Sequence, residues 1–538
     1  MSSSSRKTTG PLSKKIILYA IIGIIAVTAV YISMSERSAP EINNTEEDAN
    51  TEEQAIQRFE QQFCGTDIAP NSNAYITELT LPSECEMPLG IAIDDEKVWY
   101  VSTKLGLLGS YDTAASEFNQ YEIPSWPSRS VPFTAVPSWS MSWTVKLDTS
   151  GNNVWFTDQN NSIWRFNKAT EDFDMFNVPA NYPSAMDFDS EGNIYFIGIN
   201  SHSLFFGNVS KITNATSEGF TEISLPLDGF SGINLDLITS GGLVVDKERK
   251  DVWVSLLAFQ QKKGQLFLYD IETNKVMRIV DLPQDLGAPV GMELDNSGNV
   301  WVADHGTSTF FKYDPTTNSI TKFVTSIASP KIYGGSTPPS AYTLPYWIEK
   351  GANGSLWFNE HTGNKIARFD PEQLTLIEYW IASQNRVWAF CPEGATACGL
   401  ANVMQFTVGP DNQVWFTEWT ENKIAKLDAS TQVPIAVSTP PEVAVAKGQS
   451  IEIKVAVNAS ADFSGKMMAA GTFMPNAALG NSTGIFSEDS VSLSSGGSKE
   501  VSYTFTPADD LKQGQYMIML GAGDDNVSYM KAVKLNIV

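Results

Sequence analysis

A short strand with a central aromatic residue recurs seven times along the chain. Each copy is a short, largely apolar strand that follows a turn rich in Asp, Gly and Asn, as in GNNVWFTD (151–158) and DNQVWFTE (411–418). The central aromatic residues are Trp99, Trp155, Tyr195, Trp253, Trp301, Trp357 and Trp415. They are spaced 40 to 58 residues apart, which leaves room for about four short strands per unit. The pattern predicts an all-β fold, a seven-bladed β-propeller.

Two further strands follow in most units. The second resembles GQLFLYD (264–270), and the third, such as LIEYWIAS (376–383), completes the unit. This third strand follows only six of the aromatic strands; the missing copy, AYITELTLP (74–82), precedes the first repeat. A propeller must close its ring, and a strand from the N-terminal end achieves this by pairing with the last blade. We therefore predict that residues 74–82 pair with residues 422–428, within a propeller spanning 64–430.

The repeat ends after Asp428, and residues 431–538 have a different pattern. Three prolines, Pro434, Pro440 and Pro441, indicate a linker. IEIKVAV (451–457) then alternates strictly, and VSLSSGGSKEVSYTF (491–505) predicts a hairpin around its Gly-Gly pair. The segment predicts a small antiparallel β-sandwich of immunoglobulin-like size. Because it contains no Cys and no His, we expect a spacer or adhesion module.

The N-terminal region predicts a membrane anchor. Residues 16–34 form a stretch of 19 residues without a charge, just long enough as a helix to cross a hydrocarbon core of roughly 30 Å. Residues 1–15 before it carry four basic residues and no acid, and an acidic linker (35–63) follows. This asymmetry predicts a single-pass anchor with a cytoplasmic tail and an extracytoplasmic bulk. The alternative, a cleaved signal peptide, usually has a shorter apolar region of about 7–15 residues.

Composition agrees with an exterior location. The chain has 61 acidic and 36 basic residues, for a formal charge of −25, which argues against nucleic acid as a partner. The four cysteines form two local pairs, predicted as disulfides Cys64–Cys85 and Cys391–Cys398. Eight N-x-S/T sequons are candidate glycosylation sites: Asn43, Asn160, Asn208, Asn214, Asn353, Asn458, Asn481 and Asn526.

The last blades carry a family resemblance. VWFTE followed by NKIAKLD, with the turn GPDNQ before them, resembles the streptogramin B (virginiamycin B) lyase family, over roughly residues 74–428. The resemblance implies a seven-bladed propeller and, in the namesake enzymes, metal-assisted opening of a cyclic depsipeptide. In that family, catalytic histidines lie in a P-H-G turn about eleven residues before the repeat aromatic. The corresponding positions here are Leu89, Trp143, Ser184, Gly241, Val290, Tyr346 and Met404. Without an imidazole to move protons near neutral pH, we do not expect this lyase activity.

Two histidines provide the alternative chemistry. His305 and His361 occupy the same position in adjacent repeats, four residues after the aromatic, and each follows an acid, Asp304 or Glu360. Converging on one point, these four residues would suit a divalent cation such as Mg²⁺ or Ca²⁺. Alternatively, they are polar residues that end their strands. The catalytic candidates are His305, His361, Glu360 and Glu418.

Two further sets have both a functional and a structural interpretation. Asp304, Glu360 and Glu418 are in successive repeats and either form an acidic wall at the channel mouth or pair across blades; we favour pairing. The aromatic candidates for stacking a ligand, or for packing, are Tyr346, Trp347, Trp143 and Trp419. Three functions stay open: a surface-anchored binding or structural protein with an unknown ligand or protein at a propeller face, a metal-dependent lyase or lactonase-type hydrolase, and a subunit of a larger surface complex.

Overall fold

The computed structural model describes residues 70–126, 141–199, 201–208, 219–327, 342–385, 398–471 and 481–538. The predicted cytoplasmic tail, membrane anchor and acidic linker lie outside these ranges. Within them, no helix is both long enough and apolar enough to cross a membrane. The described residues are almost entirely β-strands and turns, with three short 3₁₀ helices: η2 (Asp228–Phe230), η3 (Leu235–Leu237) and η4 (Phe259–Gln261).

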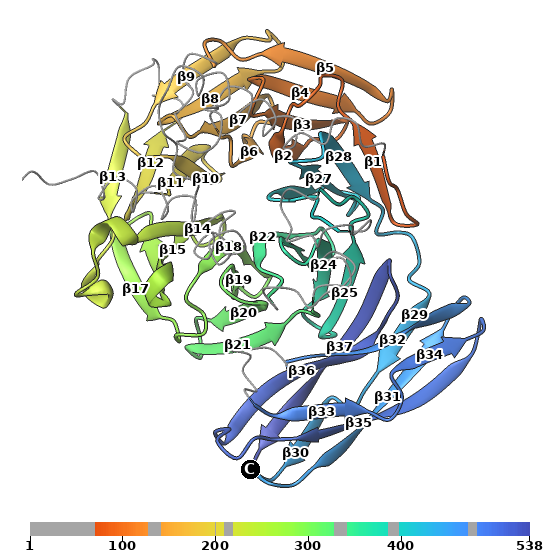
Figure 1. The fold of residues 1–538 in the computed structure, drawn as a ribbon. Helices are drawn as coiled ribbons and strands as arrows, with labels where there is room; N and C mark the ends of the chain where they lie inside the picture. Colours follow the sequence, from red (N-terminus) through yellow and green to blue (C-terminus); the bar gives the residue numbers. More distant parts are fainter. Residues whose placement is uncertain are drawn as a thin grey trace, which may run out of the picture.

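The described part of the propeller contains seven four-stranded antiparallel blades arranged in a ring (Figure 1). Blades 1 to 3 consist of β2 (Pro88–Ile93), β3 (Lys97–Ser102), β4 (Leu107–Asp112) and β5 (Glu117–Glu122); β6 (Val145–Leu147), β7 (Asn153–Asp158), β8 (Ser162–Asn167) and β9 (Phe173–Asn177); and β10 (Pro183–Phe188), β11 (Asn193–Gly198), β12 (Ser203–Asn208) and β13 (Phe220–Ser224). Blades 4 and 5 consist of β14 (Thr239–Asp246), β15 (Asp251–Ala258), β16 (Lys263–Asp270) and β17 (Lys275–Asp281); and β18 (Pro289–Leu294), β19 (Val300–Asp304), β20 (Thr309–Asp314) and β21 (Ser319–Val324). Blades 6 and 7 consist of β22 (Pro345–Lys350), β23 (Leu356–Glu360), β24 (Lys365–Asp370) and β25 (Thr375–Trp380); and β26 (Phe406–Val408), β27 (Val414–Glu418), β28 (Lys423–Leu427) and β1 (Ile76–Thr80). The predicted all-β propeller is confirmed.

The repeat aromatics hold neighbouring blades together. Each lies on the second strand of its blade and is at most 3% exposed. Several meet a ring of the following blade, with the pairs Trp99–Phe166, Trp253–Tyr313, Trp301–Phe369 and Trp415–Tyr111. A large ring at this position buries much apolar surface, and truncating such a ring to Ala typically costs about 3–5 kcal/mol. This explains why the sequence repeats an aromatic residue at one position of each blade.

Ring closure occurs where the sequence predicts it. β1 pairs antiparallel with β28, with Ile76 opposite Leu427 and Thr80 opposite Lys423. The first described strand therefore completes the last blade, and neither end of the ring is left as an open sheet edge. Cys85 and Cys398 are disulfide-bonded. Cys64 and Cys391 lie outside the described residues, so the Cys64–Cys85 and Cys391–Cys398 pairings stay predictions.

The C-terminal domain contains two sheets around a shared core. One sheet has the order β29 (Ile435–Ser438), β31 (Ile451–Ala459), β35 (Ser498–Thr506) and β33 (Thr483–Phe486). The other has the order β37 (Val527–Ile537), β36 (Gly514–Gly523), β32 (Phe463–Ala470) and β34 (Ser490–Leu493), and β30 (Glu442–Val445) pairs with β37. Val455 and Tyr503 from the first sheet pack with Leu520 and Val533 from the second.

Three expectations for this domain are wrong. The predicted hairpin around Gly496 does not form: β34 pairs with β32 in one sheet, whereas β35 pairs with β31 and β33 in the other. Alternation fixes which face of a strand is buried but does not select its partner, and the glycine turn here joins two sheets. The predicted proline linker contains β29, and β30 pairs parallel to β37, so the domain is not wholly antiparallel.

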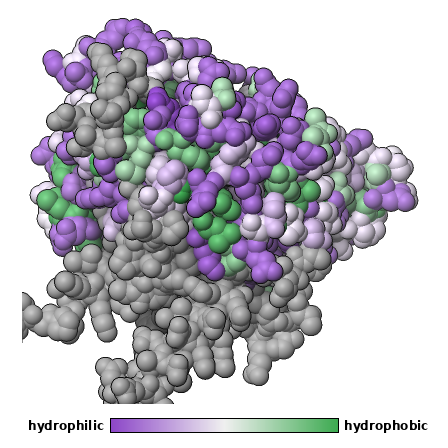
Figure 2. All heavy atoms as spheres, turned by 90° about the horizontal axis from the view of Figure 1, so that it is seen from above, coloured by the Kyte–Doolittle hydropathy of each residue, from purple (hydrophilic) through white to green (hydrophobic). Residues whose placement is uncertain are grey.

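The C-terminal domain continues the sheet of blade 6. β37 pairs antiparallel with β25, with Thr375 opposite Lys531 and Tyr379 opposite Val527. The outer edge of blade 6 is thereby covered by a strand from the end of the chain (Figure 1). The surface seen at right angles to this view is mostly hydrophilic where it is described, with hydrophobic residues in small patches (Figure 2).

Candidate functional site

Charged residues occupy the innermost strands at a fixed position of the repeat. The residue directly opposite the repeat aromatic is, in blade order, Ala92, Lys146, Asp187, Val244, Glu293, Glu349 and Thr407. Blades 2, 3, 5 and 6 thus each contribute one charged side chain. We call Lys146, Asp187, Glu293 and Glu349 the channel ring.

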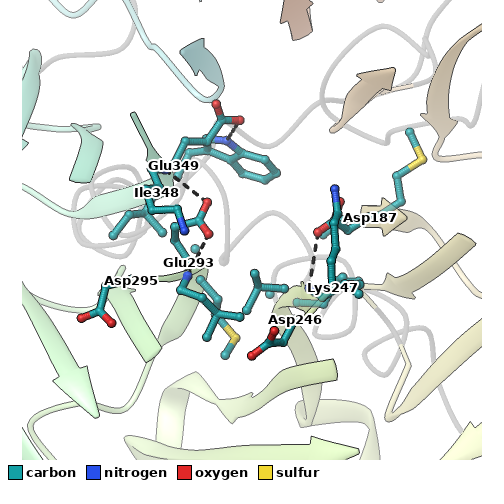
Figure 3. A pocket seen from close by; sticks show the side chains of 18 of the residues that line it. Asp187, Asp246, Lys247, Glu293, Asp295, Ile348 and Glu349 are labelled. Atoms are coloured by element: carbon teal, nitrogen blue, oxygen red, sulfur yellow. Dashed lines mark hydrogen bonds between the residues drawn. The ribbon is translucent and has the colours of Figure 1, made fainter. Parts of the chain in front are cut away.

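The channel ring faces a cavity of about 550 Å³ at the centre of the propeller. Its walls are the inner strands of blades 2 to 6, and its rim is formed by the turns after β14 and β18, including Asp246, Lys247 and Asp295. Figure 3 shows carboxylates of Asp187, Glu293 and Glu349 coming from different strands around this space. The cavity is therefore polar and opens on the side of the turns between the first and second strands.

Each ring carboxylate also joins two inner strands. Its second oxygen accepts a hydrogen bond from a backbone N–H of the next blade, in the pairs Val245 N to Asp187 Oδ2 (3.3 Å), Lys350 N to Glu293 Oε2 (3.2 Å) and Val408 N to Glu349 Oε2 (3.0 Å). The same hydrogen bond recurs in three blades, so it is a regular feature of the inner strands. These bonds fix the carboxylates at the cavity wall without neutralising their charge.

The electrostatics of the ring favour an added positive charge. Burial raises the pKa of Glu293 and of Glu349 above the ordinary carboxyl value. Burial alone lowers the pKa of the Lys146 ammonium, but the charges of Asp187, Glu349 and Glu293 outweigh it and leave the pKa raised. Lys350 also lines the cavity and lowers the pKa of Glu293. The three ring acids still outnumber these two cations, so an added cation would stabilise the ionised carboxylates.

Apolar side chains gather near the start of the inner strands of blades 1, 2 and 7. Leu89, Trp143 and Met404 occupy the positions where the lyase family has its P-H-G turns, and all three are buried in one cluster with Trp419. For Trp143 and Trp419 the structure therefore favours the packing interpretation. The other two aromatic candidates, Tyr346 and Trp347, are half-buried and line the central cavity.

His305 and His361 lie side by side but are enclosed. They are 4% and 6% exposed, and their rings are 5.5 Å apart and nearly parallel. His305 Nδ1–H donates to Pro345 O at 3.3 Å, and His361 Nε2–H donates to Asn402 Oδ1. Burial, with the neighbouring His361, lowers the pKa of His305 to about 3, and burial lowers the pKa of His361 to about 4. Both imidazoles are therefore neutral at physiological pH.

The carboxylates predicted beside them belong to separate networks. Asp304 accepts hydrogen bonds from Ala288 N and Thr307 Oγ1, both at 2.7 Å, and its burial raises its pKa to about 7. Glu360 pairs with Lys365 at 3.0 Å, and Glu418 is fully buried in blade 7. No three His, Cys, Asp or Glu side chains in the described ranges are grouped to hold a metal ion. The structure thus unites the two histidines but not the four predicted ligands.

Sequence reasoning missed the channel ring. Its signal is a charged residue about eight positions before the repeat aromatic, inside an apolar strand, as in MEL (292–294) and IEK (348–350). The lyase resemblance points instead to the position about eleven residues before the aromatic, where that family has its histidines. A charge in the middle of an otherwise apolar inner strand is the feature that would have identified the ring.

The asparagines of the sequons differ in their exposure. Asn353, Asn458, Asn481 and Asn526 are exposed, whereas Asn160 and Asn208 are half-buried. Asn43 and Asn214 lie outside the described residues. Glycosylation therefore stays a prediction.

Similar solved structures include a streptogramin B lyase, 22% identical over 66% of this chain and 99% of that chain with a TM-score of 0.48. The selenomethionine-substituted virginiamycin B lyase from Staphylococcus aureus is 20% identical over 65% of this chain and 98% of that chain, with a TM-score of 0.48. The extracellular domain of a hybrid two-component system from B. thetaiotaomicron is 12% identical over 87% of this chain and 60% of that chain, with a TM-score of 0.44. No family model matches the sequence, and no curated protein matches it.

Proposed function

We propose that this protein is a membrane-anchored, extracytoplasmic binding protein that holds a basic group of its ligand in the channel ring. The uncharged stretch 16–34, the basic residues before it and the sequons after it support the location. The binding role is supported by one observation above the others: Asp187, Glu293 and Glu349 surround Lys146 at a cavity of about 550 Å³, whose lining has six acidic and four basic residues.

The alternative, a metal-dependent lyase or hydrolase, receives less support. General acid–base chemistry needs a titrating group that reaches the substrate, but His305 and His361 are buried and donate to acceptors within the protein. Their low pKa values keep them neutral, and the carboxylates beside them in sequence have other partners. A cavity lined by carboxylates instead suits recognition of an ammonium or guanidinium group.

Isothermal titration with a charged and an uncharged probe tests the proposal. N-acetyl-lysine amide should bind the folded protein, and N-acetyl-norleucine amide, which lacks the charge, should bind at least about tenfold more weakly. Glu293→Gln with Glu349→Gln should strongly reduce this preference, because Asp187 is then the only carboxylate left in the channel ring. Lys146→Met should strengthen binding of the lysine probe, because it removes the competing ammonium.

The opposite signs of these two variants identify the ring as the site. Glu452→Gln, on the exposed face of β31 in the C-terminal domain, is the matched control and should change nothing. Binding should also weaken as pH falls, because carboxyls with raised pKa values protonate first. Equal affinity for the two probes in the unmodified protein would refute the proposed function.

A further inference from the structure

A second and larger cavity lies between the propeller and the C-terminal domain. It measures about 1050 Å³ and is bordered by residues 319–323 of β21, the turn 353–355 of blade 6, and the first residues of β36, 514–517. The pairing of β25 with β37 holds these walls at a fixed separation. Ligand sites occur preferentially at such domain interfaces. We call this cavity the interdomain cleft.

The interdomain cleft adjoins the central channel. Asp295 and Asn296, in the turn after β18, line both cavities. A ligand whose basic group reaches Glu293 can therefore extend over this turn into the cleft. The two cavities together suit an extended chain rather than a compact small molecule.

One wall of the cleft is the outer edge of blade 5. Thr325 N donates to Ser308 O at 3.0 Å, and the register continues with Val324 opposite Thr309 and Thr321 opposite Lys312. Because bonded and non-bonded pairs alternate in an antiparallel ladder, Ile320 and Lys322 direct their N–H and C=O groups away from β20. Within the described chain, β20 is the only strand that pairs with β21.

In the neighbouring blade 6, the equivalent outer edge is paired with an added strand. In blade 6, the equivalent outer strand β25 is paired along its length with β37. Blade 5 presents the same kind of edge to the cleft at Ile320, whereas Phe323 and Val324 at the end of β21 pack with Met519 of β36. Main-chain groups at a strand edge are recognised by the main chain of an added extended peptide.

We propose that the interdomain cleft and the channel ring form one site for an extended peptide with a basic residue. The proposal rests on the proposed function and deepens it. The basic side chain enters the channel ring, and the peptide main chain passes the turn at Asp295 and pairs with the edge of β21. A peptide suits both the channel ring and the edge of β21, because it has a basic side chain together with a regular series of N–H and C=O groups. An oligosaccharide lacks that series.

Synthetic peptides provide the test. An array of decapeptides with one fixed Lys is screened on the intact protein, and the tightest binder is measured by fluorescence anisotropy. Cutting this peptide to the tripeptide around its Lys should weaken binding at least about tenfold, because the main-chain bonds to β21 are lost. Methylating alternate backbone nitrogens of the decapeptide should have the same effect, with no change to the protein.

A pair of proline variants locates the contact. Ile320→Pro removes one N–H from the free edge of β21 and should weaken the decapeptide about tenfold without affecting the tripeptide. Ile279→Pro is the matched control, because Leu282 N bonds to Gly264 O and the register places Ile279 on the free edge of β17, far from the cleft. Thermal melting of both variants verifies that they fold.

The outcomes separate the two proposals. If N-acetyl-lysine amide binds but the decapeptide gains nothing over the tripeptide, or tolerates methylation, the peptide site is refuted and the channel site stands. If the lysine and norleucine probes bind equally, the proposed function fails as well. Binding of neutral oligosaccharides from a glycan array, competing with the decapeptide and lost in Ile320→Pro, would replace a peptide by a sugar as the occupant and overturn the inference.

Discussion

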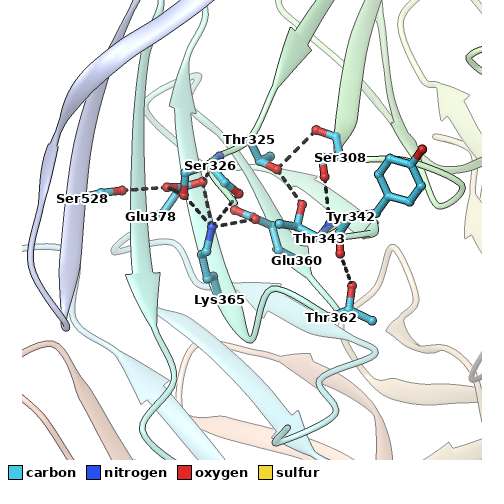
Figure 4. Close-up of polar contacts among 10 residues, drawn as sticks. All are labelled: Ser308, Thr325, Ser326, Tyr342, Thr343, Glu360, Thr362, Lys365, Glu378 and Ser528. Carbon is cyan, nitrogen blue, oxygen red and sulfur yellow. Dashed lines mark hydrogen bonds and ion pairs between the residues drawn. The ribbon is translucent and has the colours of Figure 1, made fainter. Parts of the chain in front are cut away.

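Blades 6 and 7 bury a lysine at the same position of the repeat, at the start of the third strand. In blade 6, Lys365 Nζ lies 3.0 Å from Glu360 Oε2 and 3.2 Å from Glu378 Oε1, and all three side chains are fully buried (Figure 4). In blade 7, Lys423 Nζ lies 2.9 Å from Glu78 Oε2, again fully buried. Each ammonium also donates to a serine hydroxyl from the end of the preceding blade at 2.7 Å.

We call the buried groups around Lys365 and Lys423 the blade 6 cluster and the blade 7 cluster. They differ in the side chains that the two ends of the chain contribute. In blade 6, Ser528 of β37 donates to Glu378 Oε2 at 2.7 Å. Burial raises the pKa of Glu378, but Lys365, Ser326 and Ser528 more than offset this and leave the pKa below its ordinary value.

In blade 7, Lys423 faces additional acids. Glu421 lies 3.6 Å from Lys423, and neither its oxygens nor those of Glu418 have a hydrogen-bond partner among the described residues. Burial raises the pKa of Glu418 well above its ordinary value and that of Glu421 to about 7. Blade 6 also contains a carboxyl whose pKa burial raises well above its ordinary value, Glu360. The donor from the C-terminal domain therefore helps to keep Glu378 ionised, whereas the acids added around Lys423 in blade 7 have no such donor within the described chain.

The largest expected effect comes from removing the terminal strands that complete these blades. Deleting residues 74–82 should abolish the cooperative unfolding transition of the propeller, because β28 loses its partner and the ring opens. Ending the chain at Asp428 should lower the melting temperature but preserve the transition, because the ring stays closed while β25 loses only its added strand. Circular dichroism melting distinguishes the two outcomes. An unchanged melting temperature after deletion of β1 would contradict the closure shown by the structure.

The next effect comes from removing each lysine. Lys423→Met should destabilise the protein by about 3–5 kcal/mol, because it leaves buried acids without their cation. Lys365→Met should cost about 1 kcal/mol less, because Glu378 keeps donors from Ser326 and Ser528. Urea unfolding followed by tryptophan fluorescence measures both.

Lys454→Met provides the control for these two variants. Lys454 is about half exposed and pairs with Glu452 on the surface, so its loss should cost less than about 0.5 kcal/mol. Equal losses for Lys423→Met and Lys365→Met would remove the contrast between the clusters.

The closure of the ring could be predicted from the sequence, but the donor that β37 adds to blade 6, Ser528, could not. Seven aromatic strands and six third strands leave one strand missing, and the only candidate, 74–82, lies at the other end of the chain. No comparable deficit indicates that β37 adds to blade 6, because β25 already completes its four strands. Ser528 looks like part of a sequon in the sequence, and only the pairing of β37 with β25 brings it to Glu378.

The candidate site was only partly predictable for a related reason. The equal spacing of His305 and His361 correctly suggests that they lie together, since equivalent positions on adjacent blades are neighbours. Spacing does not specify side-chain direction, so the same reasoning placed Asp304 and Glu360 beside them, although both turn to other partners. The channel ring needed the register of the inner strands, because only the pairing opposite the repeat aromatic shows that these four charged residues occupy equivalent positions.

The pH dependence of stability should differ between the clusters. The pKa of Glu421 is about 7 in the folded protein against an ordinary 4.5, so the folded state binds its proton more tightly than the unfolded state. Stability from this group is therefore complete below about pH 4.5 and is lost as pH rises through about 7, by up to about 3 kcal/mol. Glu421→Gln should remove this loss and be more stable than the unmodified protein at pH 8. Urea unfolding at intervals from pH 5 to 8 measures the difference. A constant difference across this range would contradict the protonation of Glu421.

Ser528→Ala should have the smallest effect, and it tests whether the C-terminal domain keeps Glu378 ionised. The variant removes one hydroxyl donor to a buried carboxylate, which costs about 1.5–3 kcal/mol at pH 7. Because Ser528 lowers the pKa of Glu378, its contribution is present while Glu378 is ionised and shrinks as pH falls through that lowered pKa. Ser498→Ala, which removes an exposed bond to Asn458 Oδ1 of 2.8 Å, is the control and should cost little at any pH. Urea unfolding at pH 7 and at the lowest pH where the protein stays folded gives both differences. A loss for Ser528→Ala that is equal at the two pH values would mean that Ser528 contributes packing alone, and the contrast between blades 6 and 7 would then rest on the surplus acids around Lys423.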